Sequence, residues 1–276
     1  MNMELIKVNP SKINFAELKK IAKQKNLIAI RFDVPFMVKD SQNEKYLVAN
    51  KQMNTECSQT EDSAFTRYDI LQNIDIDEPT LLNNIKGKTR YNINYAIKKG
   101  VSIIEVQNDS DFDKFYDLLI DTSKRQNYGI RDKKYYKLLF DKLVSTNSGA
   151  ILIAKHEQDI LAAWFLSFYD EVGYYMYGAS NVVKQNFQAS SLLAFEAMKL
   201  AQKKGCKLFD FWGVDKDLSD KNSKYYGVTR FKLGFGGEVI EYMDSYDLVL
   251  KKPFYYLFII LFKVRQKFIT LKKKVH

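Results

Sequence analysis

The sequence predicts an α/β protein in which one mixed sheet is flanked by helices. Hydrophobic residues make up 46% of the 276 residues, enough for a sizeable core. From residue 101 to residue 250, short runs of β-branched and aromatic residues alternate with longer segments whose apolar residues recur every three or four positions. The short runs are typical of buried strands and the longer segments of amphipathic helices.

The elements expected in this region follow the order β-α-α-β-β-β-α-β-α-β-β. Strands are predicted at 101–106, 150–155, 161–169, 173–179, 207–212, 238–242 and 246–250. Helices are predicted from Ser110 to about Gln126, from Asp132 onward, and from about Gln188 to Lys203. A further short helix is expected near residue 230. This order is similar to that of the acyltransferase fold known as GNAT.

The first hundred residues predict only part of a second such unit. A helix should begin after Asn14, which forms a capping box with Glu17, and a buried strand should follow at 27–32. Residues 38–66 show no periodicity and are expected to form a loop. One or two strands at 68–76 and two helices, divided by Gly87, complete this part. We therefore expect a partial GNAT-like unit at 1–100, a complete one at 101–250 and a separate tail at 251–276.

Cysteine and histidine usage excludes several kinds of site. Cys57 and Cys206 lie far apart and lack metal-ligand spacing, so neither a disulfide framework nor a zinc site is expected. The only histidines are His156 and His276, which leaves no Ser-His-Asp or Cys-His set. We expect no metal and no cofactor. The beginning of the sequence lacks the apolar run of a signal peptide, which favours a reducing, cytoplasmic location.

The positive charge is concentrated at the end of the chain. The net charge is +10, but residues 251–276 hold eight Lys/Arg and no acid, which leaves 35 Lys/Arg against 33 Asp/Glu before them. Residues 254–262 are all apolar or aromatic, a run too short to span a bilayer. An apolar run beside basic residues is typical of a segment lying at a membrane surface, so peripheral binding to the inner face of the plasma membrane is predicted. The alternative is a C-terminal helix docked on the body of the protein.

The segment 227–237, "GVTRFKLGFGG", carries the strongest candidate site. Phe231 and Phe235 are one helical turn apart, with Arg230 and Lys232 pointing elsewhere. Three glycines then allow the backbone to turn sharply and approach a neighbour. Cations beside such a turn suit a phosphate or carboxylate. The simpler interpretation is a helix C-terminus whose cations match the helix dipole.

Three segments together resemble the FemABX family of peptidoglycan bridge-forming aminoacyltransferases. They are "KTRYNINYAIKKGV" (88–101), "GCKLFDFWGV" (205–214) and "GVTRFKLGFGGEVIEYMDSYDLVL" (227–250), and "YYMYGAS" (174–180) adds to them. The resemblance extends from about Asn14 to Leu250. Two features of the family have no counterpart in this sequence. They are the longer N-terminal segment that completes the first unit, and the helical arm of some members. The chain is therefore similar to the armless type.

The resemblance implies transfer of an amino acid from aminoacyl-tRNA to the stem-peptide amine of a peptidoglycan precursor. Lys232, preceded by Phe231, falls on the family's Phe-Lys pair, whose lysine is implicated in stabilising charge during transfer. Tyr175 and Tyr177 fall on a Tyr-x-Tyr strand near the acceptor peptide, and they are expected to share one face of that strand. Arg125 falls on an arginine that helps to hold the precursor's phosphates.

Five further residues complete the candidate site. Tyr128 lies near the family's next aromatic residue, and Arg230 is a second candidate for substrate binding. Asp210, at the end of a predicted strand, could orient a neighbouring group or cap a turn. Lys88 and Arg90, in a basic helix without acids, could meet phosphates of tRNA or of the precursor. For each, a packing, capping or solvated role is the alternative.

Two other functions remain open from the sequence. A CoA-dependent N-acyltransferase of the same fold needs a glycine-containing loop whose amides hold the pyrophosphate. The corresponding stretch here, "KQNFQASS" (184–191), has no glycine, which favours an aminoacyl-tRNA donor. The other possibility is a degenerate member that binds the precursor without catalysis, because the front of the first unit is not matched.

Overall fold

The computed structural model describes residues 13–33, 37–38, 44–60 and 66–274. They divide into two compact units, one formed by residues up to 67 together with 240–276, and one formed by residues 68–239. The predicted boundaries at residues 100 and 250 are therefore wrong. Residues 68–100 belong to the larger unit because their strand pairs within its sheet and their helices pack on its core.

The larger unit is built on a mixed sheet with the strand order β4-β5-β6-β7-β8-β3-β9. The strands β7 and β8 are parallel, and the pairs β4–β5, β5–β6, β6–β7 and β8–β3 are antiparallel. Their bounds are Tyr68–Asn73 (β3), Ser102–Glu105 (β4), Gly149–His156 (β5), Asp159–Tyr169 (β6), Val172–Ser180 (β7), Leu208–Gly213 (β8) and Glu238–Glu241 (β9).

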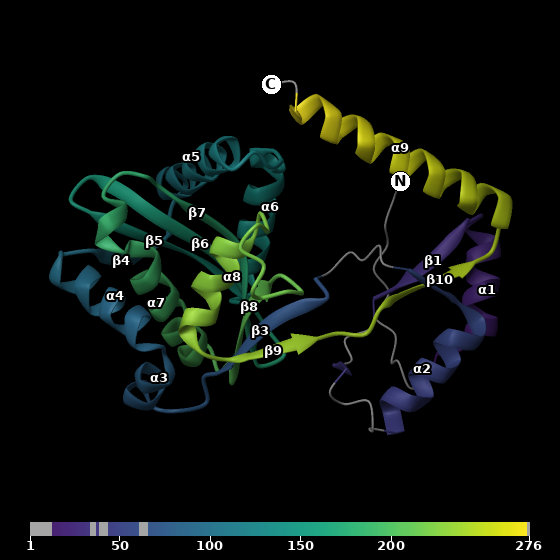
Figure 1. Cartoon of the computed structure of the whole chain (residues 1–276), viewed down its shortest axis with the longest axis horizontal. Helices are drawn as coiled ribbons and strands as arrows, with labels where there is room; N and C mark the ends of the chain where they lie inside the picture. Colours follow the sequence, from purple (N-terminus) through teal and green to yellow (C-terminus); the bar gives the residue numbers. More distant parts are fainter. Residues whose placement is uncertain (1–12, 34–36, 39–43, 61–65, 275–276) are drawn as a thin grey trace. The chain divides into compact units, whose positions relative to one another are not determined.

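Helices cover both faces of this sheet (Figure 1). One face carries α3 (Glu78–Asn84), α4 (Gly87–Lys98) and α7 (Ala189–Lys203), and the other carries α5 (Asp109–Arg125) and α6 (Lys133–Ser145). The segment between β8 and β9 forms α8 (Tyr226–Lys232) and the short helix η4 (Leu233–Phe235). The predicted order of elements from residue 101 onward is confirmed, as is the GNAT-like α/β fold.

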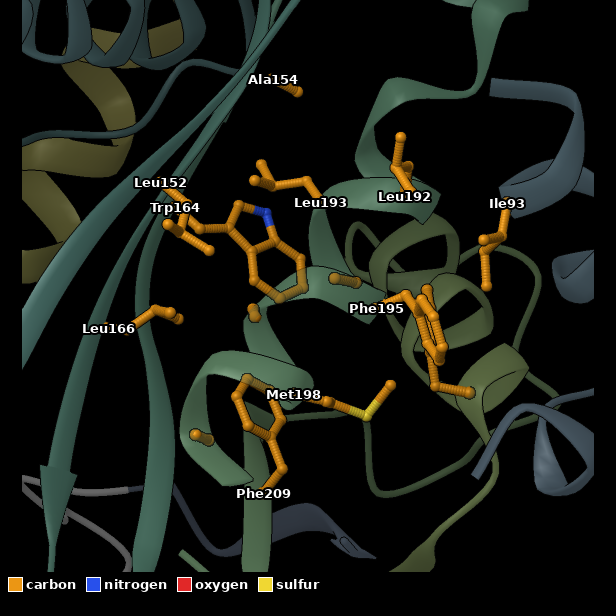
Figure 2. Close-up of a cluster of buried hydrophobic side chains, with 14 of the residues drawn as sticks. Ile93, Leu152, Ala154, Trp164, Leu166, Leu192, Leu193, Phe195, Met198 and Phe209 are labelled. Carbon is orange, nitrogen blue, oxygen red and sulfur yellow. The ribbon is translucent and has the colours of Figure 1, made fainter. Parts of the chain in front are cut away.

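The core between α7 and the sheet places a tryptophan at its centre. Figure 2 shows Trp164 of β6 extending toward α7, with Leu193 beside its ring. Met198 of the same helix and Phe209 of β8 lie nearby, Phe195 lies on the side of Ile93, and all of these side chains are buried. The apolar side chains of α7 thus fix its position on the sheet, and with it the position of its N-terminus.

The smaller unit has its own sheet, with the order β1-β10-β2. Its elements are α1 (Phe15–Gln24), β1 (Ala29–Phe32), α2 (Glu44–Glu56), β2 (Ser58–Thr60), β10 (Ser245–Val249) and α9 (Lys252–Lys274). The expectation of a loop over 38–66 is wrong where the structure describes it, because α2 and β2 lie there. The strand β10 was expected in the large sheet, but it pairs with β1 and β2 instead.

The helix α9 is attached to the smaller unit at its first turn. The Tyr255 hydroxyl donates to Asp247 Oδ2 at 2.7 Å, and the Arg31 guanidinium donates to both oxygens of the same buried carboxylate at 2.8 Å. Beyond this point most of the described apolar side chains of α9 are exposed. Within the described residues, no helix is long and apolar enough to cross a membrane.

The glycine turn that enters β9 provides a test of the packing. Gly237 has φ +84°, and a Cβ there would lie 2.8 Å from the Leu71 carbonyl oxygen and 2.9 Å from Ile70 Cγ2. Gly237→Ala should lower the free energy of unfolding by about 2–5 kcal/mol, the sum of left-handed strain and a steric clash with backbone. Chemical denaturation of the purified variant measures the loss.

The matched control for this variant is Gly205→Ala. Gly205 has φ +83° with no heavy atom within 4 Å of its added Cβ. It should therefore lose only the strain of about 1–2 kcal/mol. Equal losses in the two variants would contradict the close approach of Gly237 to β3.

Candidate active site

Lys232, the last residue of α8, has a buried ammonium group. Its side chain is 5% exposed, and Nζ donates to the carbonyl oxygens of Gly213 at 2.6 Å and Trp212 at 3.3 Å. An ammonium has three N–H donors, and among the described residues no third hydrogen-bond acceptor for Nζ is found. The remaining N–H is therefore available to a substrate oxygen. The position at the end of a short helix is as predicted from the sequence, and the side chain is buried there.

The two carbonyl groups belong to a strained turn at the end of β8. Trp212 has φ +62°, a left-handed conformation that non-glycine residues rarely adopt. Its backbone N–H donates to Asp210 Oδ1 at 2.6 Å. We infer that Asp210 stabilises the turn. The turn in this conformation directs both carbonyl oxygens toward Lys232. Asp210 thus acts on the lysine through the backbone as well as through its charge.

Asp210 forms a pair of buried carboxyl groups with Asp69 of β3. The two strands are adjacent, and their register shifts between Asp69 and Leu71. Burial raises the pKa of Asp210 to about 7, and the negative charge of Asp69 and a hydrogen bond between the two carboxyl groups also raise it. The pair therefore holds one proton below about pH 7 and loses it as the pH rises through 7.

The same carboxyl pair determines the charge of Lys232. Burial lowers the pKa of Lys232 to about 8, while the Coulombic attraction of Asp69 and Asp210 opposes that fall. Lys232 is consequently charged at pH 7 and loses its proton as the pH rises above 8. Below about pH 7, one ammonium and one shared negative charge make the cluster close to neutral, which limits the cost of burying it.

Aromatic rings form the wall beside the lysine. Nζ of Lys232 lies 5.6 Å from the centre of the Tyr175 ring, which stacks on Trp164 with ring centres 3.8 Å apart. Phe231 also packs on Trp164, with its ring centre 6.3 Å from that of Trp164 and 5.1 Å from that of Phe235. The predicted pairing of Phe231 with Phe235 is thus present. These rings exclude water around the ammonium and strengthen its electrostatic interactions.

Tyr175 and Tyr177 lie on opposite faces of the sheet, so the prediction of a shared face is wrong. Tyr175 is opposite Leu166 and Tyr177 is opposite Phe165, which leaves Met176 as an extra residue in a β-bulge. The bulge reverses the alternation of side chains. Tyr175 therefore reaches the Lys232 side, whereas the Tyr177 ring packs on Tyr136 with ring centres 5.0 Å apart.

A cavity of about 600 Å³ lies beside Phe231, at the N-terminus of α7. Lys88 and Arg230 bring positive charge to it, and Ser180, Asn181, Ser190 and Ser191 bring polar groups. Gln188, the N-cap residue of α7, makes no capping hydrogen bond with its side chain, while the Ser191 N–H donates to its carbonyl oxygen at 2.9 Å. The partial positive charge of a helix N-terminus favours an anion, so the cavity suits a phosphate-bearing substrate.

The loop before α7 is unlike a glycine-rich pyrophosphate loop. Lys184 and Gln188 adopt left-handed conformations with φ +49° and +59°, although neither is glycine. The Lys184 ammonium is held by Glu157 at 3.1 Å and Asp159 at 2.9 Å, and Phe187 packs on His156 with ring centres 5.0 Å apart. The loop therefore presents the side chains of Lys184 and Phe187 in place of the bare glycine backbone that holds a pyrophosphate in CoA-binding loops.

The other predicted residues have different surroundings. Arg125 is exposed and donates to the Ser180 carbonyl oxygen at 2.6 Å, at the edge of the cavity. Tyr128 is half-buried, and burial raises its pKa. Arg90 does not line the cavity. Its Nη1 atom donates to three carbonyl groups around the end of α3, including Asn83 O at 3.2 Å, so its charge joins α3 to α4.

The sequence analysis missed Asp69, Trp164 and Trp212. A carboxylate at the start of a strand gives no signal of burial, and pairing between β3 and β8 is not visible in the sequence.

The described residues contain no group of three or more His, Cys, Asp or Glu side chains that could hold a metal ion. The residues of this site can supply charge stabilisation by Lys232 and control of its proton by the carboxyl pair.

The sequence is similar to those of known transferases. The lipid II:glycine glycyltransferase of Staphylococcus haemolyticus is 23% identical over 87% of this chain and 73% of its own length. That of S. aureus is 24% identical over 69% of this chain and 61% of its own length. The chain thus spans about 60–73% of the relatives it matches.

Solved structures confirm the fold. The crystal structure of FemX matches with a TM-score of 0.79 and 20% identity, over 88% of this chain and 77% of that one. A lysylphosphatidylglycerol synthase, L-PGS from Bacillus licheniformis, matches with a TM-score of 0.52 and 12% identity, over 86% of this chain and 72% of that one. The sequence profile of the FemAB family matches residues 11–148 and 144–263. This protein therefore belongs to the FemAB family.

Proposed function

We propose that this protein transfers an amino acid from aminoacyl-tRNA to the stem-peptide amine of a peptidoglycan precursor. The observation that carries the proposal is the buried, charged Lys232, which keeps one N–H donor free beside a phosphate-suited cavity. The relatives named lipid II:glycine glycyltransferase support lipid II, or a related precursor, as the acceptor. Their names also support a transferase that builds interpeptide bridges of the cell wall.

The proposed reaction needs no covalent enzyme intermediate. The acceptor amine, once deprotonated, attacks the carbonyl carbon of the aminoacyl ester, and the carbonyl oxygen becomes an oxyanion. The C–O bond to the ribose then breaks, the ribose oxygen takes up a proton, and the nitrogen loses one to give the amide. The free N–H of Lys232 would stabilise the oxyanion, an interaction much stronger in the transition state than in the ground state.

The donor and the acceptor have different candidate surfaces. The cavity with Lys88, Arg230 and the N-terminus of α7 suits the terminal phosphates and ribose of a tRNA. Arg125, at the edge of the same cavity, remains the candidate for the precursor's phosphates, with Tyr128 three residues after it in the sequence. Tyr177 lies on the opposite sheet face from Lys232, so we place it with the acceptor surface and not with the reacting atoms.

Transfer from charged tRNA tests the proposal directly. Purified protein should move a radiolabelled amino acid from tRNA to a lysine-containing muropeptide, and acetyl-CoA should show no binding by calorimetry at micromolar concentration. The reason is that side chains fill the loop that CoA would need. Micromolar acetyl-CoA binding without tRNA-dependent transfer would favour the CoA-dependent alternative. Precursor binding without transfer from any aminoacyl-tRNA would favour a non-catalytic member.

Replacing Lys232 tests the role of its charge. Lys232→Met should lower turnover about 100-fold or more, which corresponds to about 2.7 kcal/mol of lost transition-state stabilisation. Lys224→Met is the control, because Lys224 is exposed on the loop before α8. Steady-state transfer rates for both variants, with circular dichroism to confirm folding, decide the question. A Lys232→Met variant with normal turnover would remove the lysine from the mechanism.

We further propose that α9 holds the protein at the inner surface of the plasma membrane. Seven large apolar side chains between Phe254 and Val264 are exposed on this helix, while Ile259 and Phe262 are half-buried. Lys263, Arg265 and the later lysines follow them in sequence. Exposed apolar side chains combined with basic ones match an anionic bilayer, where each Lys/Arg near the surface adds about 1 kcal/mol. A lipid-linked acceptor would be reached from this surface.

Vesicle sedimentation tests the role of α9. The wild-type protein should bind phosphatidylglycerol vesicles, less so as salt rises, and the double variant Leu257→Asp/Leu261→Asp should bind at least tenfold more weakly. Both leucines are exposed, at 52% and 58%, so folding should be preserved. The control is Leu138→Asp/Val144→Asp on α6, at 70% and 47% exposure. Equal binding by the two double variants would assign the membrane contact elsewhere.

A further inference from the structure

The helix α4 carries a concentration of positive charge that its own stability does not explain. Residues 79–104 contain five Lys/Arg and no Asp or Glu. Among the described residues, no carboxylate forms a salt bridge with any of the five, which are Lys86, Lys88, Arg90, Lys98 and Lys99. This surface is therefore positive and free of internal neutralisation.

The N-terminus of α4 is the least expected place for these charges. Lys86 is the N-cap residue without a capping hydrogen bond, Lys88 follows in the first turn, and the first turn has no acidic residue. A helix N-terminus already carries a partial positive charge, so cations there are destabilising. Positions where a sequence departs from a local rule without structural compensation are candidates for function.

Aromatic rings alternate with these cations along one face of α4. Lys88, Tyr91, Tyr95 and Lys99 lie three or four residues apart, so they form one stripe. The Tyr91 and Tyr95 rings are stacked, with centres 5.9 Å apart and planes 20° from parallel. The Lys88 ammonium lies 5.4 Å from the centre of the Tyr91 ring, and that of Lys99 lies 5.4 Å from the centre of the Tyr95 ring. We call these four residues the α4 stripe.

The α4 stripe begins at the cavity beside Phe231. Lys88 lines that cavity, and the adjacent Thr89 both lines it and packs against Gly234 of η4. From Lys88 to Lys99 the helix rises about 16 Å, at 1.5 Å per residue. At its far end the Lys99 ammonium lies 5.5 Å from the centre of the Phe187 ring, which adds a third aromatic group. Gln185 and Gln188, on either side of Phe187 in the sequence, also line the cavity, so both ends of the stripe lie near cavity-lining residues.

We propose that the α4 stripe binds the single-stranded 3′ end of the donor tRNA. The proposal rests on the proposed function and specifies where the donor lies. Bases of a single strand stack on aromatic side chains regardless of sequence, and lysines pair with the phosphates between them. Tyr91, at 58% exposure, offers the most accessible ring, and the two lysines flank the aromatic pair. A strand running along the stripe would deliver its terminal ribose to the cavity.

Two features favour RNA over a lipid surface as the partner of this stripe. The aromatic groups are tyrosines stacked nearly parallel to each other, with cations over the rings, an arrangement suited to planar bases with intervening phosphates. The only large aliphatic side chain exposed on α4 is Ile97. A membrane-binding helix would instead present several aliphatic residues together, as α9 does.

Binding of uncharged RNA tests the stripe separately from catalysis. The probe is a fluorescent acceptor-stem hairpin with a four-nucleotide single-stranded 3′ end, compared by anisotropy with the same hairpin lacking that end. Wild-type protein should bind the first at least tenfold more tightly. Tyr91→Ala should remove most of this difference by loss of stacking. Lys88→Gln/Lys99→Gln should weaken binding and lower the slope of log Kd against log salt concentration by about 1.4.

The controls come from the same helix and from remote lysines. Ile97→Ala alters an equally exposed side chain, at 54%, and Lys142→Gln/Lys203→Gln removes two exposed lysines from α6 and α7. Both should leave RNA binding within twofold of wild type. Equal affinity of the wild type for the two hairpins, or equal effects of stripe and control variants, would overturn the proposal. So would a Tyr91→Ala variant that loses vesicle binding but keeps RNA binding.

The failure of this inference is distinguishable from the failure of the proposed function. If the wild-type protein transfers amino acids and Tyr91→Ala retains its affinity and its KM for aminoacyl-tRNA, the function stands and the stripe has no part in donor binding. If the wild-type protein binds the hairpin through the stripe but transfers nothing, the stripe stands and the transferase proposal fails.

Discussion

The site depends on keeping a lysine charged inside the protein. Transfer of Lys232 from water into the core lowers its pKa, and the negative charge of Asp69 and Asp210 limits that fall to about 8. The carbonyl oxygens of Trp212 and Gly213 accept hydrogen bonds from the same ammonium. Without these groups the lysine would be neutral near physiological pH and would lose its value for stabilising an oxyanion.

Several local features of the fold serve this arrangement. The left-handed Trp212, tied to Asp210, turns the end of β8 so that its carbonyl groups face the lysine. The bulge at Met176 brings Tyr175 to the same side of the sheet. Gly178 leaves room for the Tyr175 ring, because a Cβ at that position would collide with the tyrosine hydroxyl. Each of these departures from regular strand geometry thus positions a group of the site, either the carbonyl groups that face Lys232 or the Tyr175 ring.

The strength of the local sequence signal separates what could be predicted from what could not. Residues 101–235 alternate clear strand and helix patterns, so the order of elements and the GNAT-like fold followed from periodicity. The helix α2 has weak amphipathic patterning, and its polar sequence resembled a loop. The sequence of β10 predicts an ordinary strand, but its partners β2 and β1 lie more than 180 and more than 210 residues before it in the chain. Pairing of that kind leaves no local trace.

The candidate site residues were likewise predictable where a local motif surrounds them and not where their role depends on distant parts of the chain. Lys232, Phe231 and Asp210 were found through the motif around them, and the structure brings them together with Tyr175. The faces of Tyr175 and Tyr177 were misassigned because an alternating pattern cannot reveal a bulge. Asp69 was missed because its role depends on Asp210 across the sheet. Arg90 looked like a phosphate ligand, yet its donors are used by the carbonyl groups at the end of α3.

The charge state of Lys232 is the central claim, and its titration can be followed directly. Protein labelled with ¹³C at the lysine ε-carbons should show one lysine, identified by its absence from Lys232→Met, whose signal titrates near pH 8. In Asp69→Asn the same signal should titrate at lower pH, because one of the negative charges that stabilise the ammonium is gone. Titration of Lys232 near its ordinary value of 10.5 in the wild type, or no change in Asp69→Asn, would contradict the account.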